Sequence, residues 1–227
     1  MSSQPPIRYA VLVPVKPPAV GKSRLAAVEG EARRRLAEAF AQDTVLACLR
    51  ADRVGRVLVV TDDAHFSVVL SALGCDAIPD GVAGDLNGSL RQAAAEAHRR
   101  WPDLVPIAVC ADLPALRPDD LDVVLDGLAT TVRTRPGFVP DAAAVGTTMY
   151  AATYDRFDPR FGHGSRAAHL DAGAAEVVDA PASVRRDVDD TDDLADAAGL
   201  GLGPATSLAI AEGNAERAAT PGGGGPS

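Results

Sequence analysis

Short apolar runs alternate with stretches of helical periodicity along the first half of the chain. Continuous apolar and β-branched runs predict strands buried on both faces at Tyr9–Val15, Arg56–Thr61 and Val105–Ala111, with a shorter strand at Asp76–Pro79. Helical spacing predicts helices over Glu31–Arg50, Ala64–Leu73 and Ser89–Trp101, the last with Asn87 near its start. Repeated βα units of this kind indicate an α/β fold with a mostly parallel sheet covered by helices.

The pattern becomes less regular after Leu128. Strands are expected near Phe138–Val139, Thr147–Ala152 and Glu176–Val178, with a helix near Ser165–Ala172. The last recognisable helix follows Asp190 and runs to about Gly199, and the residues from Ala218 on have the composition of a flexible tail. We therefore expect one domain over residues 1–209, followed by a C-terminal end with a Gly/Pro-rich tail at 210–227.

Charge, cysteine use and hydropathy exclude several classes of protein. The 227 residues carry a net charge of -9, so neither a nucleic-acid backbone nor an anionic membrane is an expected partner. Cys48, Cys75 and Cys110 lack CxxC or His spacing, which favours buried thiols in a reducing compartment. No signal-peptide pattern opens the chain and no apolar run reaches membrane-spanning length, so the protein is expected to be cytoplasmic.

A basic loop follows the first predicted strand. It contains Gly21-Lys22-Ser23, which is typical of a Walker A loop, but that loop requires a glycine where this chain has Lys16. What remains is a turn that carries Lys16, Lys22 and Arg24, cations suited to a polyphosphate. A solvated basic loop after a buried strand is the alternative interpretation.

Acidic residues stand at a second strand end and in a distant run. Asp112 follows the third buried strand, where a carboxylate is costly unless it is paired or bound to metal. In Asp187-Val188-Asp189, the alternation of an extended chain points both carboxylates to one side. The alternatives are a solvated acidic run and a helix cap at Asp190 or the threonine after it. Because ligands bind beyond the carboxyl ends of parallel strands, these acids and the basic loop fit a Mg²⁺-dependent nucleotidyltransferase.

A set of segments, taken in order, resembles one enzyme family. The segments are Val13-Pro-Val-Lys16 with Lys22-Ser-Arg-Leu25, Asp85-Leu-Asn-Gly-Ser-Leu90, Asp112-Leu-Pro-Ala-Leu116, Val145-Gly-Thr-Thr148, Arg160-Phe-Gly162 with Ser165, and Asp187-Val-Asp189 leading to Asp193-Leu194. Up to about Ala209, the chain is similar to the 2-phospho-L-lactate or phosphoenolpyruvate guanylyltransferases of coenzyme F420 biosynthesis. The resemblance implies a single-domain nucleotidyltransferase fold, similar to the glycosyltransferase A type, with helices on both faces of the sheet and an antiparallel insertion. The chain departs from the family pattern at Gly21, Ala111 and Asp190, and none of these departures removes a charged group.

The resemblance also implies a reaction and a set of residues. A phosphate oxygen of a small phosphorylated acid attacks the α-phosphorus of the co-substrate GTP, and pyrophosphate leaves. The implied catalytic residues are Lys16, Lys22, Arg24 and Asp112, and the implied Mg²⁺ ligands are Asp112, Asp187 and Asp189. The implied nucleotide contacts are Lys16, Lys22, Ser23, Arg24, Asn87 and Gly88, and the implied acceptor contacts are Thr148, Gly162 and Ser165. The alternative for Ser165 is a cap of the helix that follows it.

The acceptor and two other classes of protein stay open. The Ala, Arg and Asp bias favours a high-GC bacterial source and hence phosphoenolpyruvate, with 2-phospho-L-lactate or 3-phosphoglycerate as alternatives. A sugar-phosphate or molybdopterin-type nucleotidyltransferase would share the fold, and a noncatalytic regulator would bind the nucleotide without turnover. For the guanylyltransferase, transient hand-over of the product to the next transferase of the pathway is an expected partnership.

Overall fold

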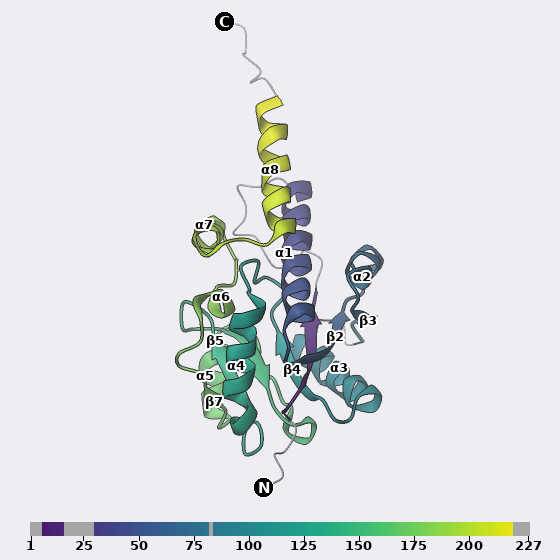
Figure 1. Cartoon of the computed structure of the whole chain (residues 1–227), viewed down its shortest axis with the longest axis vertical. Helices are drawn as coiled ribbons and strands as arrows, with labels where there is room; N and C mark the ends of the chain where they lie inside the picture. The colour runs from purple at the N-terminus through teal and green to yellow at the C-terminus, as the bar shows by residue number, and fades with distance from the viewer. Residues whose placement is uncertain (1–5, 16–29, 82–83, 220–227) are drawn as a thin grey trace, which may run out of the picture.

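The structure is a computed structural model of the chain that describes residues 6–15, 30–81 and 84–219. At the centre of the described residues lies a seven-stranded sheet in the order β3-β2-β1-β4-β6-β5-β7 (Figure 1). β1 to β4 pair in parallel, β6 is antiparallel to β4 and β5, and β7 is parallel to β5. The strands are β1 (Tyr9–Pro14), β2 (Val54–Val60), β3 (Asp76–Ile78), β4 (Val105–Val109), β5 (Gly137–Pro140), β6 (Thr147–Ala151) and β7 (Ala175–Glu176).

Helices cover both faces of this sheet, which confirms the predicted fold class. Along β1, Val11 and Val13 face the side covered by α1, α2 and α4, while Ala10 and Leu12 face the side covered by α3. Because successive residues of a strand point to opposite faces, a run without polar interruptions is what a sheet covered on both sides requires. The helices are α1 (Gly30–Arg50), α2 (Ala64–Ser71), α3 (Leu86–Arg100), α4 (Pro118–Thr131), the 3₁₀ helix η2 (Tyr154–Arg156), α5 (Ser165–Asp171), α6 (Ala182–Arg185), α7 (Thr191–Leu200) and α8 (Pro204–Ala219).

The helix α8 is an element that the sequence pattern did not predict. The helix predicted after Asp190 and up to about Gly199 is present as α7, but it is not the last one, because α8 follows it and runs across residue 209, where the domain was expected to end. α8 packs along α1, and the two helices stand side by side at one end of the molecule (Figure 1). The buried carboxylate of Asp43 on α1 accepts hydrogen bonds from the Ala205 and Thr206 amides at 3.0 and 2.8 Å, which fixes the start of α8. Most of the expected tail, residues 220–227, lies outside the described residues.

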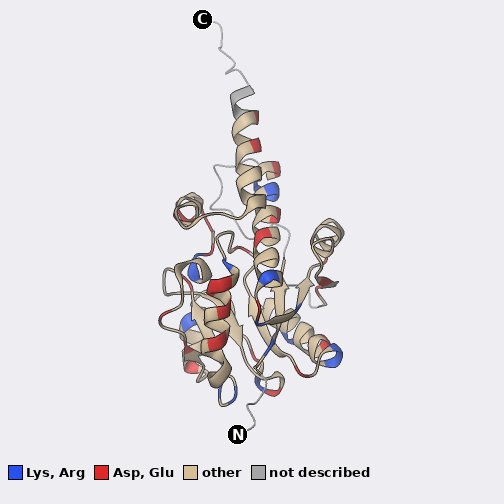
Figure 2. Cartoon of the chain, in the orientation of Figure 1, with Lys and Arg blue, Asp and Glu red and all other residues tan. Residues whose placement is uncertain are grey.

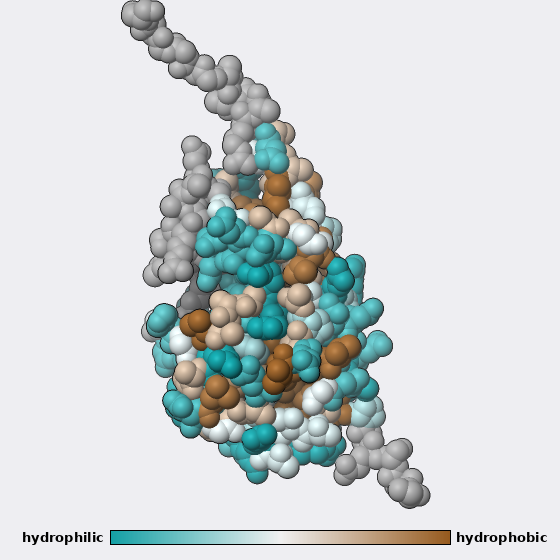
Figure 3. Space-filling view, turned by 90° about the vertical axis from the view of Figure 1, so that its left-hand side faces the viewer, coloured by the Kyte–Doolittle hydropathy of each residue, from teal (hydrophilic) through white to brown (hydrophobic). Residues whose placement is uncertain are grey.

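The surface reflects the acidic composition. Figure 2 shows acidic residues along α4, and the hydrogen bonds of two of them connect this helix to neighbouring segments. Asp122 accepts hydrogen bonds from the Asp52 and Arg53 amides, both at 2.8 Å, and Asp120 accepts one from the Ser183 hydroxyl at 2.6 Å. On the face that carries α5, α6 and α7, apolar side chains are interspersed with hydrophilic ones (Figure 3). Among the described helices, none combines the length and apolar character that crossing a bilayer requires.

Candidate active site

The site lies where the parallel strands end. β4 ends at Val109, which is paired with Met149 of the antiparallel β6, and the Cys110 amide donates a hydrogen bond to the Thr148 carbonyl at 2.9 Å. Because β6 runs opposite to β4, its first residue, Thr147, lies at the carboxyl edge of the parallel strands, where α/β proteins bind their ligands. The antiparallel strand therefore brings the second half of the chain to the edge where Asp112 follows β4.

A backbone hydrogen bond brings the two acidic segments together. The Val188 amide donates to the Asp112 carbonyl at 3.0 Å, so the distant Asp-x-Asp segment lies against the end of β4. The Val188 side chain is fully buried in an apolar cluster with Phe40 and Ala197, whereas Asp187 and Asp189 both line a cavity of about 600 Å³. The alternation predicted for this segment is therefore present, and it aims both carboxylates at one space.

Thr44, in the middle of α1, holds the backbone on both sides of Asp112. Its hydroxyl accepts a hydrogen bond from the Leu113 amide at 3.1 Å and donates one to the Ala111 carbonyl at 3.3 Å. Thr44 is fully buried, so the hydroxyl has these backbone groups rather than water as partners. Sequence reasoning missed this residue, because a threonine within a long helix carries no local sign of a partner far along the chain.

The electrostatics of the acidic segment favour a bound cation. Burial first, and then the negative charges of Asp112, Asp189 and Asp141, together raise the pKa of Asp187 to about 7. A carboxyl group surrounded by other carboxylates is relieved by a positive charge, and oxygen donors suit Mg²⁺. Within the described residues, no group of three or more His, Cys, Asp or Glu side chains is arranged to hold a metal ion. The three predicted ligands, Asp112, Asp187 and Asp189, therefore do not form a ready-made three-carboxylate site, and Mg²⁺ held by them would complete its shell with water and substrate phosphates.

The rest of the acidic run shapes the turn into α7. Asp190 is the N-cap of α7 and accepts hydrogen bonds from the Asp192 and Asp193 amides, both at 3.0 Å. The Asp193 carboxylate accepts a hydrogen bond from the Asp190 amide at 3.3 Å and forms an ion pair with Arg186 at 3.0 Å. The helix-cap interpretation is thus correct for Asp190, while Asp187 and Asp189 face the cavity.

The same cavity contains two of the three predicted acceptor residues. Gly162 and Ser165 line it, but Thr148 is fully buried and its hydroxyl donates to the Val184 carbonyl at 2.8 Å. The preceding residue, Thr147, lines the cavity instead. Sequence reasoning missed Thr147, because neighbouring residues of a strand face opposite sides and two consecutive threonines give no sign of which one faces the site.

A glycine-rich turn presents Gly162 and Ser165. Gly162 has a φ of +134° and Gly164 one of +70°, conformations that favour glycine. Gly164 is the N-cap of α5 and Ser165 is the first helical residue, so the alternative interpretation of Ser165 as the cap is wrong. Ser165 is 2 % exposed, and the Ser165 and Arg166 amides already donate to the Gly162 and Val145 carbonyls at 3.1 and 3.2 Å. The group of this turn that suits an anionic ligand is therefore the Ser165 hydroxyl, which can donate a hydrogen bond.

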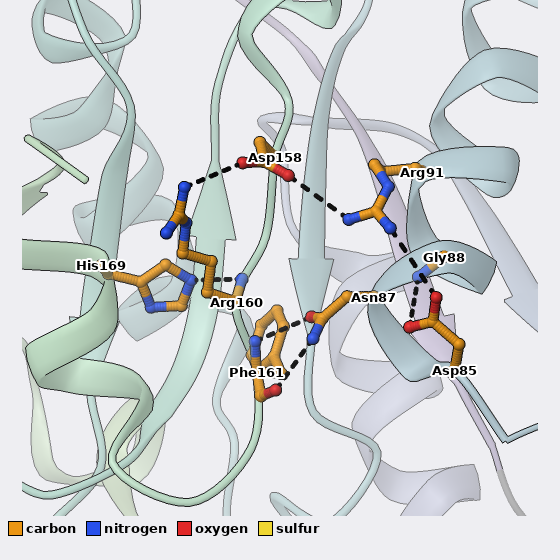
Figure 4. A network of polar contacts seen from close by, with 8 residues as sticks. All are labelled: Asp85, Asn87, Gly88, Arg91, Asp158, Arg160, Phe161 and His169. Atoms are coloured by element: carbon orange, nitrogen blue, oxygen red, sulfur yellow. Dashed lines mark hydrogen bonds and ion pairs between the residues drawn. The ribbon is translucent and has the colours of Figure 1, made fainter. Parts of the chain in front are cut away.

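Asn87 and Gly88 lie at the start of α3, opposite this turn (Figure 4). The N-cap of α3 is Asp85, whose carboxylate accepts a hydrogen bond from the Gly88 amide at 2.9 Å, so the helix begins before the predicted Ser89. The Asn87 carboxamide pairs with the backbone of Phe161, donating to its carbonyl at 3.0 Å and accepting from its amide at 2.8 Å. Asn87 therefore joins α3, on the expected nucleotide side, to the turn on the expected acceptor side.

The predicted triphosphate-binding residues lie outside the described part of the chain. Lys16, Lys22, Ser23 and Arg24 fall within residues 16–29, between the end of β1 and the start of α1. The described residues place the end of β1 beside β4, the strand that Asp112 follows.

Two solved structures share the architecture of this chain. A putative nucleotide-diphospho-sugar transferase from Desulfovibrio desulfuricans G20 aligns with a TM-score of 0.63 and 17% identity, over 92% of this chain and 96% of that one. A CMP:2-keto-3-deoxy-manno-octonic acid synthetase complexed with CTP aligns with a TM-score of 0.53 and 15% identity, over 85% of this chain and 98% of that one. The chain therefore shares the fold of these two structures, in which helices cover both faces of a mostly parallel sheet.

Comparison with sequence relatives identifies the family. The chain is 47% identical to the phosphoenolpyruvate guanylyltransferase of Streptomyces scabiei (strain 87.22), over 90% of this chain and 97% of that one. It is 44% identical to the protein of the same name from Thermomonospora curvata, over 90% of each chain. The family model described as "Guanylyl transferase CofC like" matches residues 9–199, and the chain belongs to this family. The family resemblance inferred from the sequence is thereby confirmed, and the chain is a nucleotidyltransferase of the guanylyltransferase type.

Proposed function

We propose that the protein transfers GMP from GTP to phosphoenolpyruvate, giving enolpyruvoyl-2-diphospho-5'-guanosine and pyrophosphate in coenzyme F420 biosynthesis. The observation that carries the proposal is the shared cavity, in which Asp187 and Asp189 face the turn of Gly162 and Ser165. In this arrangement, acids that would bind a cation and a turn that would bind an anionic acceptor line one cavity, as a reaction between two phosphates requires. The names of the relatives support the same substrate pair.

The acidic residues are assigned to the metal. Asp112, Asp187 and Asp189 would hold Mg²⁺, which supplies charge neutralisation for the phosphate oxygens. The contact between the Val188 amide and the Asp112 carbonyl supports the assignment, because it keeps the two acidic segments adjacent before any ligand arrives. Thr44 would keep Asp112 in register with them.

The nucleotide is assigned to the basic loop and to the start of α3. Lys16, Lys22, Ser23 and Arg24 would neutralise the triphosphate of GTP, and Asn87 and Gly88 would lie near the nucleoside. For the loop, the support is its position in sequence directly after β1. For Asn87 and Gly88, the support is their place at the start of α3, next to Leu86, which lines the cavity.

The acceptor is assigned to the glycine-rich turn and the start of β6. Gly162, Ser165 and the Thr147 hydroxyl would hold the carboxylate of the phosphorylated acid, and Thr148 would support them by fixing β6 to the Val184 carbonyl. An oxygen of the acceptor phosphate then bonds to the α-phosphorus of GTP, the bond from that phosphorus to the β-phosphate oxygen breaks, and pyrophosphate leaves with the electron pair. Because the attacking phosphate is already ionised at neutral pH, the protein contributes alignment and charge neutralisation.

A pyrophosphate-release assay tests the proposal. GTP, ATP and CTP are each combined with phosphoenolpyruvate, 2-phospho-L-lactate, 3-phosphoglycerate and a sugar phosphate. The greatest turnover is expected with GTP and phosphoenolpyruvate, and it should be lost in Asp187→Asn but kept in Asp192→Asn, a matched loss of one exposed charge in the same run. Preference for another phospho-acid would show that phosphoenolpyruvate is not the acceptor. Turnover with the sugar phosphate would indicate a sugar-phosphate nucleotidyltransferase. Binding of GTP without any turnover would indicate a noncatalytic regulator. The product would pass in the cytoplasm to the next transferase.

A further inference from the structure

A buried histidine lies directly behind the acceptor side of the cavity. His169, on α5, is fully buried and is packed among the rings of Phe138, Tyr150 and Phe161, with centroids 4.7 to 5.7 Å from its own. An imidazole in such apolar surroundings is costly unless its polar nitrogens have partners. Nothing in the proposed reaction uses this side chain directly.

Both ring nitrogens of His169 are hydrogen bonded. The Arg160 amide lies 2.8 Å from Nε2, and the Thr147 hydroxyl oxygen lies 3.0 Å from Nδ1. An amide N–H can only donate, so Nε2 accepts and the ring hydrogen resides on Nδ1. Burial, together with the charge of Arg160, lowers the pKa of His169 to about 4, which keeps the ring neutral near pH 7 and preserves this tautomer.

The tautomer of His169 sets the direction of the Thr147 hydroxyl. The Nδ1–H has two acceptors, the Thr147 oxygen and the Ser165 backbone carbonyl. A protonated Nδ1 cannot accept, so the hydroxyl hydrogen of Thr147 points away from the ring, and Thr147 lines the cavity. Directed toward the cavity, this hydrogen would suit a carboxylate or phosphate oxygen, which can only accept.

The same ring also joins the three segments that form this side of the cavity. His169 contacts the first residue of β6 and the Arg160 amide at the base of the glycine-rich turn, and it lies on the helix that begins at Ser165. Figure 4 shows the Arg160 bond, with the Asn87 carboxamide holding the next residue, Phe161, from the opposite side.

We propose that His169 is a positioning residue for the acceptor, which holds the Thr147 hydroxyl as a hydrogen-bond donor toward the anionic group of the phosphorylated acid. The proposal rests on the proposed function, because it takes the cavity beside Thr147 as the acceptor site. His169 touches neither substrate, and its effect passes through Thr147 and the turn at Arg160.

A double-mutant cycle tests this role. His169→Phe keeps an aromatic ring in the pocket but removes both hydrogen bonds, and Thr147→Val removes the hydroxyl. Each is expected to raise the KM for phosphoenolpyruvate about tenfold or more, with the KM for GTP changed less than about twofold. The KM of the double variant for phosphoenolpyruvate should be no higher than that of the more impaired single variant, because both substitutions break the same contact. His98→Phe, which replaces an imidazole stacked on Tyr154 away from the cavity, is the matched control and should behave as wild type.

Nuclear magnetic resonance of the ¹⁵N-labelled wild-type protein gives a second readout that needs no variant to fold. The His169 ring is expected to show a protonated Nδ1 and an unprotonated Nε2 at pH 7. Three results would overturn the proposal: the increases in KM of the two single variants multiply in the double variant, the KM values for GTP and phosphoenolpyruvate change equally, or the ring hydrogen lies on Nε2. Absence of turnover with every phospho-acid in the wild type would overturn the proposed function and this inference together, whereas turnover without coupling would overturn the inference alone.

Discussion

The raised pKa of Asp187 predicts that metal binding weakens in mild acid. The carboxyl group must lose its proton to act as a ligand, so the apparent dissociation constant is the intrinsic value multiplied by one plus the ratio of protonated to ionised Asp187. With a pKa of about 7, that factor is about 1.1 at pH 8 and about 11 at pH 6, so the affinity should fall about tenfold over this range, or about 1.4 kcal/mol.

Direct binding of Mn²⁺ as a Mg²⁺ substitute measures this effect. The loss of the free-ion electron paramagnetic resonance signal is followed at pH 6, 7 and 8 without GTP or acceptor, because their phosphates would bind metal and titrate in the same range. Asp187→Asn should bind more weakly and lose the pH dependence, whereas Asp192→Asn should keep it. Equal wild-type affinity at pH 6 and pH 8, or an unchanged pH dependence in Asp187→Asn, would refute the reasoning.

The same carboxyl group should make the metal-free protein less stable. Because its folded-state pKa lies above the usual value of 3.8, the unfolded chain ionises first, and this contribution to stability is lost as pH rises from about 4 to about 7. The shift of about three units corresponds to at most about 4 kcal/mol. Asp187→Asn should therefore raise the Tm of the metal-free protein at pH 8, and a lower Tm would contradict the assigned cause of the pKa shift.

Three further predictions concern buried polar contacts. Thr44→Val should lower kcat about tenfold to hundredfold through displacement of Asp112, whereas Thr44→Ser, which keeps the hydroxyl, should stay near wild type in steady-state kinetics; equal losses would assign Thr44 to packing alone. His169 has a pKa of about 4 in the folded protein, against a usual value of 6.5. Its contribution to the free energy of unfolding, up to about 3 kcal/mol, should therefore be lost as the pH falls from 6.5 to about 4. Denaturant titrations of His169→Phe should lack this part of the acid sensitivity. Asp43→Ala should cost about 1 to 3 kcal/mol of unfolding free energy in the same measurement, and an unchanged value would mean that the start of α8 is held by other contacts.

The sequence predicts those features whose cause is local. Buried parallel strands must be apolar on both faces, so β1, β2 and β4 are recognisable as continuous runs. The arrangement of Asp187-Val188-Asp189 can be predicted in the same way, because a valine buried between two acids leaves both carboxylates on the side opposite to its own side chain.

Features that depend on distant partners were not predictable. α8 is rich in alanine and polar residues, and its docking depends on Asp43, far away on α1. The choice between Thr147 and Thr148 depends on the register of β6 against β4, and a shift of one residue exchanges the two faces of the strand. In each case the local residues permit more than one outcome, and tertiary packing decides.

The residues assigned to the acceptor lie in one continuous segment of the chain that includes the antiparallel strand β6. Thr147, Gly162 and Ser165 all lie within residues 137–176, whereas the acids assigned to the metal lie before and after that segment. Asn87 is hydrogen bonded to this segment through the carbonyl and amide of Phe161. These are backbone groups, so a segment of different sequence can form the same bonds. A chimera that receives residues 137–176 from a relative with a different acceptor should therefore inherit that acceptor preference while it keeps its own nucleotide chemistry. Under this assignment, the range of acceptors would change with the exchange of one continuous piece of chain.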